Sequence, residues 1–447
     1  SDMHTLGYAF KPWTGKKAIV DGPDILAYIR ETARENDVER HIRCLHKVKH
    51  VAWSTEQARW RLTIERPTGE NGGVETVTMT AAFLWSCSGY YDYDDGYTPD
   101  FPGLERFAGE IVHPQKWHEG IAYADKRIVV IGSGATAMTL IPQLAKRAAH
   151  VTMLQRSPTY VFSRPAKDFI NDKLREWLPE ATAYSLTRWK NVLLGMLLYE
   201  VSQRRPELVR QWLIGRVKRE LGEAYAEEHF TPDYGPWDQR LCVIPDDDLF
   251  HAIRDGRASV VTASIDTFTE RGIRLSDGRE LEADMIVTAT GLVLRFAGGM
   301  TMSKDGRDVQ PSELVNYRGS MFSDVPNFAT TAGYTNASWT LKADLTADFI
   351  VRILRVMDRR GAAIVTPRLR DPNMPRKPLI NLMSGYVKRA ADWLPKQGTR
   401  TPWRMHQNYI LDTLMIRYGS LDDGELELSE RPKVPLAAAD SPQQHPA

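Results

Sequence analysis

The run "RIVVIGSGATA", Arg127 to Ala137, combines an apolar stretch with closely spaced glycines. Gly132, Gly134 and Ala137 have the spacing G-x-G-x-x-A, in which the first glycine makes a tight turn and the second lets the backbone approach a pyrophosphate. The small third residue lets the following helix pack closely on the strand, and the helix start offers free N–H groups to phosphate. The pattern predicts a dinucleotide site, and the alternative is a domain of this type with an empty loop. The predicted contacts are Gly132, Ser133, Gly134, Ala135, Thr136 and Ala137.

A second apolar run, "HVTMLQ" (His150 to Gln155), ends in Arg156 and Ser157. An NAD site usually places an acidic residue at this point to bind the ribose hydroxyls. An arginine suits a 2′-phosphate instead, because its guanidinium is a fixed cationic fork. The sequence therefore predicts NADP rather than NAD, with Arg156 and Ser157 among the contacts.

The stretch before the glycine loop, Phe107 to His118, follows the pattern F-x-G-x-x-x-H-x-x-x-W. Its defining residues are Phe107, Gly109, His113 and Trp117. From the frequencies of these residue types, the pattern is expected by chance roughly 6 × 10⁻⁴ times in a chain of this length. Coincidence is therefore a poor explanation for it.

This pattern resembles the fingerprint of the Baeyer–Villiger monooxygenases, a branch of the flavin-dependent monooxygenases. That fingerprint usually ends in Pro or Asp, whereas His118 stands here. Other stretches are similar to the ethionamide-activating type of this branch, and the resemblance extends from residue 1 to about residue 430. These stretches include "CSGYYDYDDGY", "LQRSPTY", "GPWDQRLC", "GYTNASWTLKADL" and "LPKQGTRTPWR".

The resemblance implies an enzyme that uses FAD and NADPH. NADPH would reduce the flavin, which would take up O₂ as a C4a-peroxyflavin and transfer one oxygen atom to the substrate. Ketones would give esters, and sulfur compounds such as thioamides would be oxygenated. The cofactor carries that chemistry, while the protein orients it and adjusts the local charge. The partners implied are a small ketone or sulfur-containing substrate and O₂.

The resemblance also assigns roles to residues outside the glycine loop. Arg240, in "WDQRLC", matches the active-site arginine of the family and would stabilise an oxyanion. His113 and Trp117 would couple the domains. Val48 matches a position whose backbone meets the flavin adenine, and Asn336 and Trp339 lie in a segment beside the flavin ring. Without the resemblance, Arg240 reads as a surface ion pair and Val48 as an ordinary strand residue.

The fold expected from the elements around these residues is α/β, with two Rossmann-like dinucleotide-binding domains. Residues 1–122 would be the remainder of an FAD domain that is incomplete at its N-terminus. Residues 123–290 would form an inserted NADP domain with a helical insertion, and 291–447 would return to the FAD domain. No other glycine loop precedes Gly132, and the sequence begins with Ser1. We therefore expect a piece of a longer monooxygenase. A natural short form, or an NADPH-binding chain without redox turnover, is the alternative.

Composition narrows the function classes. The net charge of +1 gives no field that would attract nucleic acid. The three cysteines are widely spaced, which indicates a reducing cytoplasmic setting and argues against a disulfide reductase or a zinc site. A sulfur- or nitrogen-oxygenating flavin enzyme is the nearest competing activity, and product analysis would separate it from a ketone oxygenase.

Several further elements are predicted from periodicity and turn residues. We expect a helix over residues 23–35, strands over 48–54 and 59–65, a hairpin turn over 67–73, and a helix over 341–360. Residues 186–221 read as an amphipathic surface helix or, alternatively, as a helix on a membrane surface. The Pro- and Ala-rich tail, 432–447, is predicted to be disordered.

Overall fold

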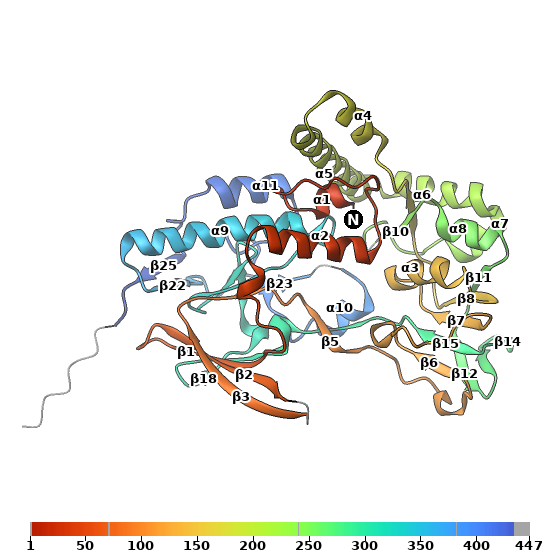
Figure 1. Cartoon of the computed structure of the whole chain (residues 1–447), viewed down its shortest axis with the longest axis horizontal. Coiled ribbons are helices and arrows are strands. Elements are labelled where there is room, and N and C mark those ends of the chain that lie inside the picture. The colour runs from red at the N-terminus through yellow and green to blue at the C-terminus, as the bar shows by residue number, and fades with distance from the viewer. Residues whose placement is uncertain (1, 70–71, 240, 381, 433–447) are drawn as a thin grey trace, which may run out of the picture.

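The computed structural model describes residues 2–69, 72–239, 241–380 and 382–432. The predicted α/β class is confirmed (Figure 1). The predicted disordered tail lies, apart from Pro432, outside the described residues.

A five-stranded parallel sheet carries the glycine loop. Its order is β11-β8-β7-β15-β6, and every neighbouring pair is parallel. The strands are β6 (Glu110–Val112), β7 (Arg127–Ile131), β8 (His150–Gln155), β11 (Ala258–Thr262) and β15 (Met285–Thr288), with helices α3 (Ala135–Leu144) and α8 (Asp248–Arg254) on one face. β6 precedes residue 123, so the sheet begins within the first predicted segment, and the division at 122 stays a prediction.

The central strand β7 is apolar along its length because both of its faces are covered. Ile128 and Val130 join the core beneath α3, whereas Val129 and Ile131 join a second cluster on the opposite face. The second face is covered by a three-stranded antiparallel sheet, in which Gly278 lies in a turn at φ +87°. Its strands are β12 (Ile265–Thr269), β13 (Gly272–Leu275) and β14 (Glu280–Glu282).

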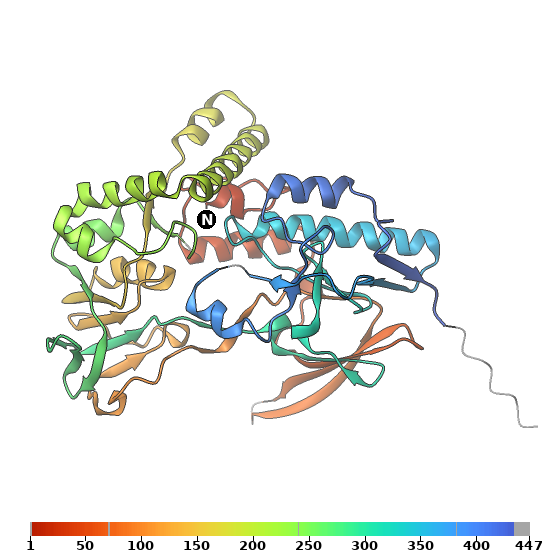
Figure 2. The same ribbon diagram turned by 180° about the vertical axis from the view of Figure 1, so that it is seen from behind.

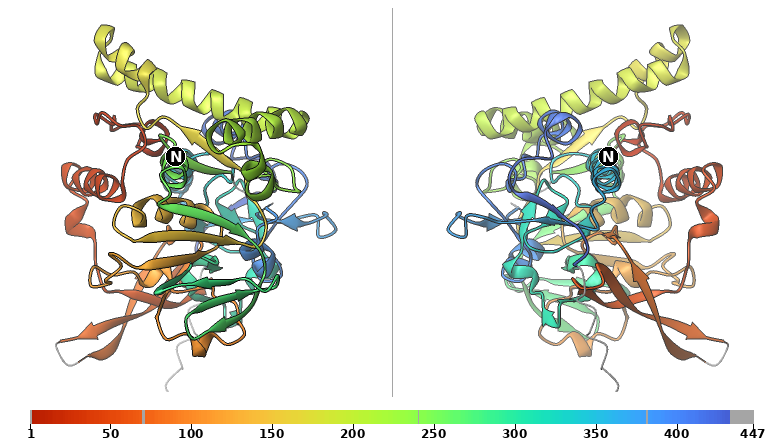
Figure 3. Two further views of the ribbon diagram at one scale, coloured as in Figure 1. Left: turned by 90° about the vertical axis from the view of Figure 1, so that its right-hand side faces the viewer. Right: turned by 90° about the vertical axis from the view of Figure 1, so that its left-hand side faces the viewer.

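A mainly helical segment is inserted between β8 and β11. Its helices α4 and α5 project from the body of the molecule (Figures 1 and 3). The single helix expected over residues 186–221 is two helices. They meet at Pro206, which has no N–H to continue the α-helical ladder. The elements are β9 (Val161–Arg164), α4 (Phe169–Trp177), α5 (Glu180–Arg204), α6 (Pro206–Leu221), α7 (Glu223–His229) and β10 (Cys242–Pro245), with β9 and β10 paired in parallel.

The rest of the chain forms a second unit from its first and last segments. The mixed sheet β18-β17-β1-β2-β3 and the parallel pair β4–β21 share a core, and Ala329 of β21 also joins the core of α9 (Figure 2). The predicted helices and strands at 23–35, 48–54, 59–65 and 341–360 are confirmed. The elements are α1 (Met3–Leu6), α2 (Gly22–Glu35), β1 (Lys47–Ser54), β2 (Arg59–Thr68), β3 (Gly73–Ala81), β4 (Leu84–Ser86), β17 (Thr301–Lys304), β18 (Arg307–Asp308), β21 (Phe328–Thr330) and α9 (Trp339–Arg360).

Shorter elements complete this unit. They are β5 (Tyr91–Gly96), β16 (Leu292–Leu294), β19 (Val315–Tyr317), β20 (Met321–Phe322), β22 (Ile364–Pro367), β23 (Lys377–Pro378), α10 (Gly385–Ala390), β24 (Lys396–Gln397), α11 (Tyr409–Thr413) and β25 (Leu426–Ser429). Two connections join the units: residues 97–109 lead from β5 to β6, and 289–291 lead from β15 to β16. Single helical turns lie at Glu39–His41, Leu104–Arg106, Pro114–Lys116, Phe296–Gly299 and Pro311–Glu313, and a π-turn at Leu414–Tyr418.

Candidate functional site

The glycine loop follows β7 at the carboxyl edge of the parallel sheet, where ligands bind in folds of this type. Gly132 has φ +124°, and a side chain there would collide with the carbonyl oxygen of Ala289. Gly134 caps α3, and no atom lies within 4 Å of the place its Cβ would take. Gly132 is therefore required by the backbone, whereas Gly134 leaves open space above the first turn of α3.

A cavity of about 210 Å³ opens at this loop. Its described lining includes Ser133, Gly134, Thr136, Ser157 and Gln239, and contains no aspartate or glutamate. Free helix-start N–H groups, hydroxyls and the absence of carboxylates from this described lining fit the pyrophosphate of a dinucleotide.

The residues at the end of β8 and directly after it have different surroundings. Gln155 is buried, and its amide donates to the carbonyl oxygen of His229 (2.7 Å) and to Oγ1 of Thr262 (2.9 Å). Arg156 is exposed, and no carboxylate of the described chain pairs with its guanidinium. Ser133 Oγ donates to the carbonyl oxygen of Ser157 (3.5 Å). Gln155 is thus a structural residue, and Arg156 is available to a ligand phosphate.

Phe107 and Gly109 have packing roles. Phe107 is buried in the cluster that also holds Phe268 and Ile273. A Cβ on Gly109 would lie 2.6 Å from the Phe107 ring and 2.7 Å from the carbonyl oxygen of Asp284. The glycine is needed because the chain passes directly over the ring.

His113 contacts the end of β5 and the 289–291 connection between the units. The backbone N–H of Gln115 donates to its Nδ1 (3.2 Å), so Nε2 carries the proton and donates to the carbonyl oxygen of Gly291 (3.3 Å). Its ring lies directly beside Gly96, where a Cβ would collide with the imidazole. Burial lowers the pKa of His113 below its ordinary value of 6.5, although the bond to Gly291 opposes the shift. The neutral ring therefore fixes β5 and the 289–291 connection to each other.

Trp117 packs against the core of the parallel sheet and meets the ring of Tyr123 edge-on at 5.7 Å. It is half-buried and, like the other three fingerprint residues, is absent from the described lining of the dinucleotide cavity. Phe107 and Trp117 thus pack on opposite faces of the parallel sheet, and the expected coupling of the domains by His113 and Trp117 stays a prediction.

The predicted flavin-side residues lie at the start of α9. Trp339 is the first residue of that helix, and its ring centroid is 4.6 Å from that of Tyr90. Asn336 donates to the carbonyl oxygen of Gln407 (3.0 Å), while its own Oδ1 is buried without a hydrogen-bond partner. Ser338 precedes the helix but makes no capping bond to it.

A second cavity, of about 60 Å³, lies beside these residues at the carboxyl ends of the parallel strands β4 and β21. It is lined by aromatic and small residues that include Ser86, Tyr90, Gly333 and Trp339. Aromatic walls, an unbonded amide oxygen nearby and an uncapped helix start suit a flavin ring. The present space of about 60 Å³ holds a few waters at most, which is less than a flavin ring system needs.

Val48 and Arg240 are the two remaining residues that the sequence assigned to the site. Val48 pairs with Ile64 across β1 and β2, and its side chain packs against the core of that sheet. Arg240 lies outside the described residues. Gln239 and Cys242 both line the dinucleotide cavity.

The sequence analysis did not predict a buried polar cluster that joins Tyr334, Lys342 of α9 and Asp412 of α11. Lys342 Nζ lies 2.8 Å from Asp412 Oδ2, and the Tyr334 hydroxyl donates to the same oxygen at 2.8 Å. Both charged side chains are almost fully buried. The sequence does contain a signal for this cluster. Lys342 lies on the apolar face of α9 with Leu345 and Phe349, and a lysine on such a face predicts a buried charge.

The flavin-binding monooxygenase-like family model matches residues 17–298. The chain is 50% identical over 434 residues to the FAD-containing monooxygenase EthA of Mycobacterium tuberculosis, covering 97% of this chain and 88% of that protein. It is 43% identical over 433 residues to the probable FAD-binding monooxygenase AlmA of Acinetobacter baylyi, covering 96% and 86%.

Solved structures share the fold. A steroid monooxygenase bound to NADP matches with a TM-score of 0.70 at 21% identity, covering 96% of this chain and 90% of that one. Cyclohexanone monooxygenase with bound ε-caprolactone matches with a TM-score of 0.69 at 17% identity, covering 96% and 89%. FAD and NADP, the cofactors expected from the sequence, are those that the names of these relatives and of an OTEMO complex state.

No helix in the described part of the chain is long and apolar enough to cross a membrane. The family match and the identities above confirm the resemblance, the fold and the expected enzyme class. The chain belongs to the flavin-binding monooxygenase-like family.

Proposed function

We propose that the chain is an FAD- and NADPH-dependent monooxygenase that inserts one oxygen atom of O₂ into ketones, to give esters. We extend the proposal to the oxygenation of sulfur compounds such as thioamides. The observation that carries it is the Phe107–Trp117 stretch, in which His113 contacts Gly96 at the end of β5 and donates to the carbonyl oxygen of Gly291 in the 289–291 connection. A reaction that uses two nucleotide cofactors needs their binding units to keep a defined relative position, and contacts such as those of His113 would help to hold it.

The dinucleotide loop is the proposed NADP site. Ser133 to Ala137 would face the pyrophosphate, and Arg156 with Ser157 would bind the 2′-phosphate. Asn336, Trp339 and Val48 are the proposed FAD contacts. Bound together, the two cofactors would supply hydride transfer and the activation of O₂. The protein's own part is to hold them in place, keep water away and provide fixed charge.

Arg240 is the proposed source of that charge. A guanidinium is cationic at every pH at which a protein folds, and its five donors suit an oxygen that becomes negative during reaction. We expect Arg240→Ala to retain both cofactors and to lose oxygenation by about 10² to 10³-fold. Arg240→Lys should recover part of the rate, and Arg205→Ala on the α5–α6 junction is a control that should change nothing.

The first test needs no substrate. The purified chain is incubated with FAD, freed of excess and examined for a retained flavin spectrum. NADPH-dependent O₂ consumption is then measured, and products from a cyclic ketone and from an aryl thioamide are identified. An ester and an oxygenated sulfur product support the proposal. NADPH binding without retained flavin or O₂ uptake would instead favour the alternative, an NADPH-binding chain without redox turnover. Sulfur oxygenation without ester would limit the activity to sulfur.

A further inference from the structure

A serine that could cap helix α9 is engaged elsewhere. Ser338 stands at the N-cap position of α9, where its backbone is extended (φ −61°, ψ 135°). A serine at this position normally accepts a hydrogen bond from one of the first helical N–H groups. In the described chain the side chain makes no such bond, and its Oγ lies 2.7 Å from Oγ1 of Thr5 in α1 instead. Both side chains are buried.

The direction of the hydrogen bond between Thr5 and Ser338 is set by Asp2. Oγ1 of Thr5 lies 3.2 Å from both Oδ2 and the carbonyl oxygen of Asp2. Burial raises the pKa of the Asp2 carboxyl, but Arg164 and Asn191 lower it more, so its pKa lies below the ordinary value. An ionised carboxylate only accepts hydrogen bonds. The single hydroxyl proton of Thr5 therefore goes to Asp2, and Ser338 donates its own proton to Thr5.

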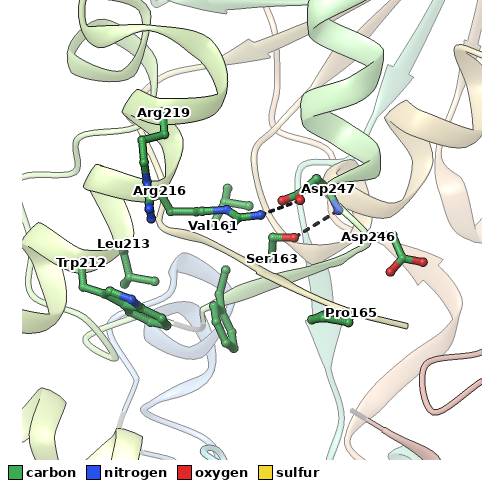
Figure 4. A pocket seen from close by; sticks show the side chains of 10 residues that line it. Val161, Ser163, Pro165, Trp212, Leu213, Arg216, Arg219, Asp246 and Asp247 are labelled. Carbon is green, nitrogen blue, oxygen red and sulfur yellow. Dashed lines mark hydrogen bonds and ion pairs between the residues drawn. The ribbon is translucent and has the colours of Figure 1, made fainter. Parts of the chain in front are cut away.

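The Asp2 carboxylate is held in place from the inserted segment. Asp2 is 3% exposed, and Arg164 Nη1 of β9 donates to its Oδ2 (3.1 Å) while Asn191 Nδ2 of α5 donates to its Oδ1 (3.0 Å). Arg164 lies between Ser163 and Pro165, which line a cavity of about 370 Å³ between β9 and α6 (Figure 4). Because side chains alternate along a strand, Arg164 points away from that cavity and toward α1. The acceptor for the hydroxyl proton is therefore fixed in position.

The helix start that Ser338 leaves uncapped borders the cavity beside Trp339. Trp339 is the first residue of α9 and lines that cavity together with Gly333 and Thr335 of the preceding turn. The first N–H groups of a helix carry partial positive charge and attract an electron-rich oxygen. A capping side chain and a ligand oxygen compete for these groups, because each N–H is a single donor.

We propose that Thr5 is a positioning residue for FAD. Its hydroxyl, oriented by Asp2, holds Ser338 away from the start of α9 and so keeps the first N–H groups of that helix available to the flavin ring. The inference rests on the proposed FAD site and adds to it a residue that acts through Ser338. Without the Thr5 hydroxyl, Ser338 would keep a buried hydroxyl that lacks its partner, and turning to the helix start would satisfy it.

FAD binding to the purified chain is measured by the quenching of flavin fluorescence, without substrate or NADPH. Thr5→Val keeps the shape of the side chain and removes its hydroxyl. It should weaken FAD about fivefold, the effect of a typical serine cap. Thr5→Val combined with Ser338→Ala also removes the competing cap, and should bring the affinity back to within about twofold of the wild type. Thr5→Ser and Ser338→Ala alone should bind FAD like the wild type.

Hydrogen exchange gives a second readout, which needs no cofactor. In the chain without FAD, the N–H groups of Thr340 and Leu341 should exchange several-fold more slowly in Thr5→Val than in the wild type, because Ser338 then caps the helix. In the double variant they should exchange at the wild-type rate. Thr187→Val is a matched control, since its buried hydroxyl donates to Asn171 (3.1 Å), and it should change neither measurement.

FAD affinity and exchange that both stay unchanged in Thr5→Val would overturn the inference. A double variant that binds FAD no better than Thr5→Val would overturn it too, because Thr5 would then only stabilise the fold. A wild-type chain that takes up no FAD contradicts the proposed function instead. The exchange of Thr340 and Leu341 then decides on the inference alone.

Discussion

At the scale of single residues, the two loop glycines should respond oppositely to alanine. Gly132→Ala places a Cβ against the Ala289 carbonyl at φ +124°, so we expect a loss of about 1–3 kcal/mol in unfolding free energy. Gly134→Ala meets nothing within 4 Å and should change stability by less than about 0.5 kcal/mol. It should still weaken NADP⁺ at least tenfold, because the methyl group fills the phosphate space. Urea unfolding and NADP⁺ titration measure both effects.

Arg156 is expected to set the choice between the two nicotinamide cofactors. Arg156→Gln removes the cation proposed for the 2′-phosphate and should weaken NADPH by about tenfold or more while leaving NADH nearly unchanged. Arg147→Gln is a matched control, since that side chain lies over the Tyr123 ring instead. An equal loss for both cofactors would show that Arg156 acts on stability or on the shared pyrophosphate.

The sequence could specify these residues because their signal is local. The glycine spacing and the residues after β8 lie within about 30 positions of one another. The partner of His113 could not be found in this way, since Gly291 is 178 positions away and is an ordinary glycine in its local context. The structural role of Gln155 could not be predicted either, because its hydrogen-bond partners His229 and Thr262 come from other elements.

At the scale of elements, the contact of His113 with Gly291 should make the free energy of unfolding depend on pH. Burial lowers the folded-state pKa of His113, so the unfolded chain takes up the proton first as pH falls. The contribution of the neutral His113 ring to the free energy of unfolding is therefore present above about pH 6.5 and is lost as pH falls below that value. We expect His113→Gln, which can still donate to Gly291, to lose less stability than the wild type between pH 7.5 and 5.5. Parallel urea curves at both pH values would disprove this.

The Lys342–Asp412–Tyr334 cluster should hold α9 and α11 together. Asp412→Asn or Lys342→Met leaves a buried charge without its partner, and each should cost about 3–5 kcal/mol. The double variant removes both charges, keeps an acceptor for Tyr334, and should recover more than half of that loss. Arg360→Met is a matched control, because its pair with Asp422 is exposed. Additive losses in urea unfolding would refute the coupling.

Helices and strands were predictable where one face is apolar and the ends carry turn residues, as in α2, α9, β1 and β2. The break between α5 and α6 was missed although Pro206 marks it, because the apolar run continues on both sides. The sheet that carries the dinucleotide loop also takes its edge strand β6 from before the predicted boundary. A strand of three residues, of which only Ile111 and Val112 are apolar, carries too little periodicity to show which sheet it joins.

At the scale of the whole molecule, one helix has more apolar surface than the fold covers. One face of α5 is buried, yet Leu186, Leu193 and Leu197 on another are 49%, 49% and 59% exposed. Their spacing puts them on one side of the helix. Residues 167–220 hold 11 arginines and lysines against 7 aspartates and glutamates, a net charge of +4, although the whole chain carries +1.

This projecting, basic and apolar region fits the surface of an anionic bilayer, which we propose as its partner (Figure 3). Leucines on one helical face would enter the headgroup region while exposed tryptophans and arginines lie at its edge. The chain should therefore float with vesicles that contain phosphatidylglycerol, and several-fold less with neutral phosphatidylcholine vesicles or at high salt. Leu193→Glu with Leu197→Glu should abolish flotation. Val74→Glu, an equally exposed apolar position on β3, is the control and should not. If the double variant floats like the wild type, the contact lies elsewhere. If neither chain binds anionic vesicles, the apolar face of α5 must be covered by protein, and the oligomeric state at micromolar concentration then becomes the deciding measurement.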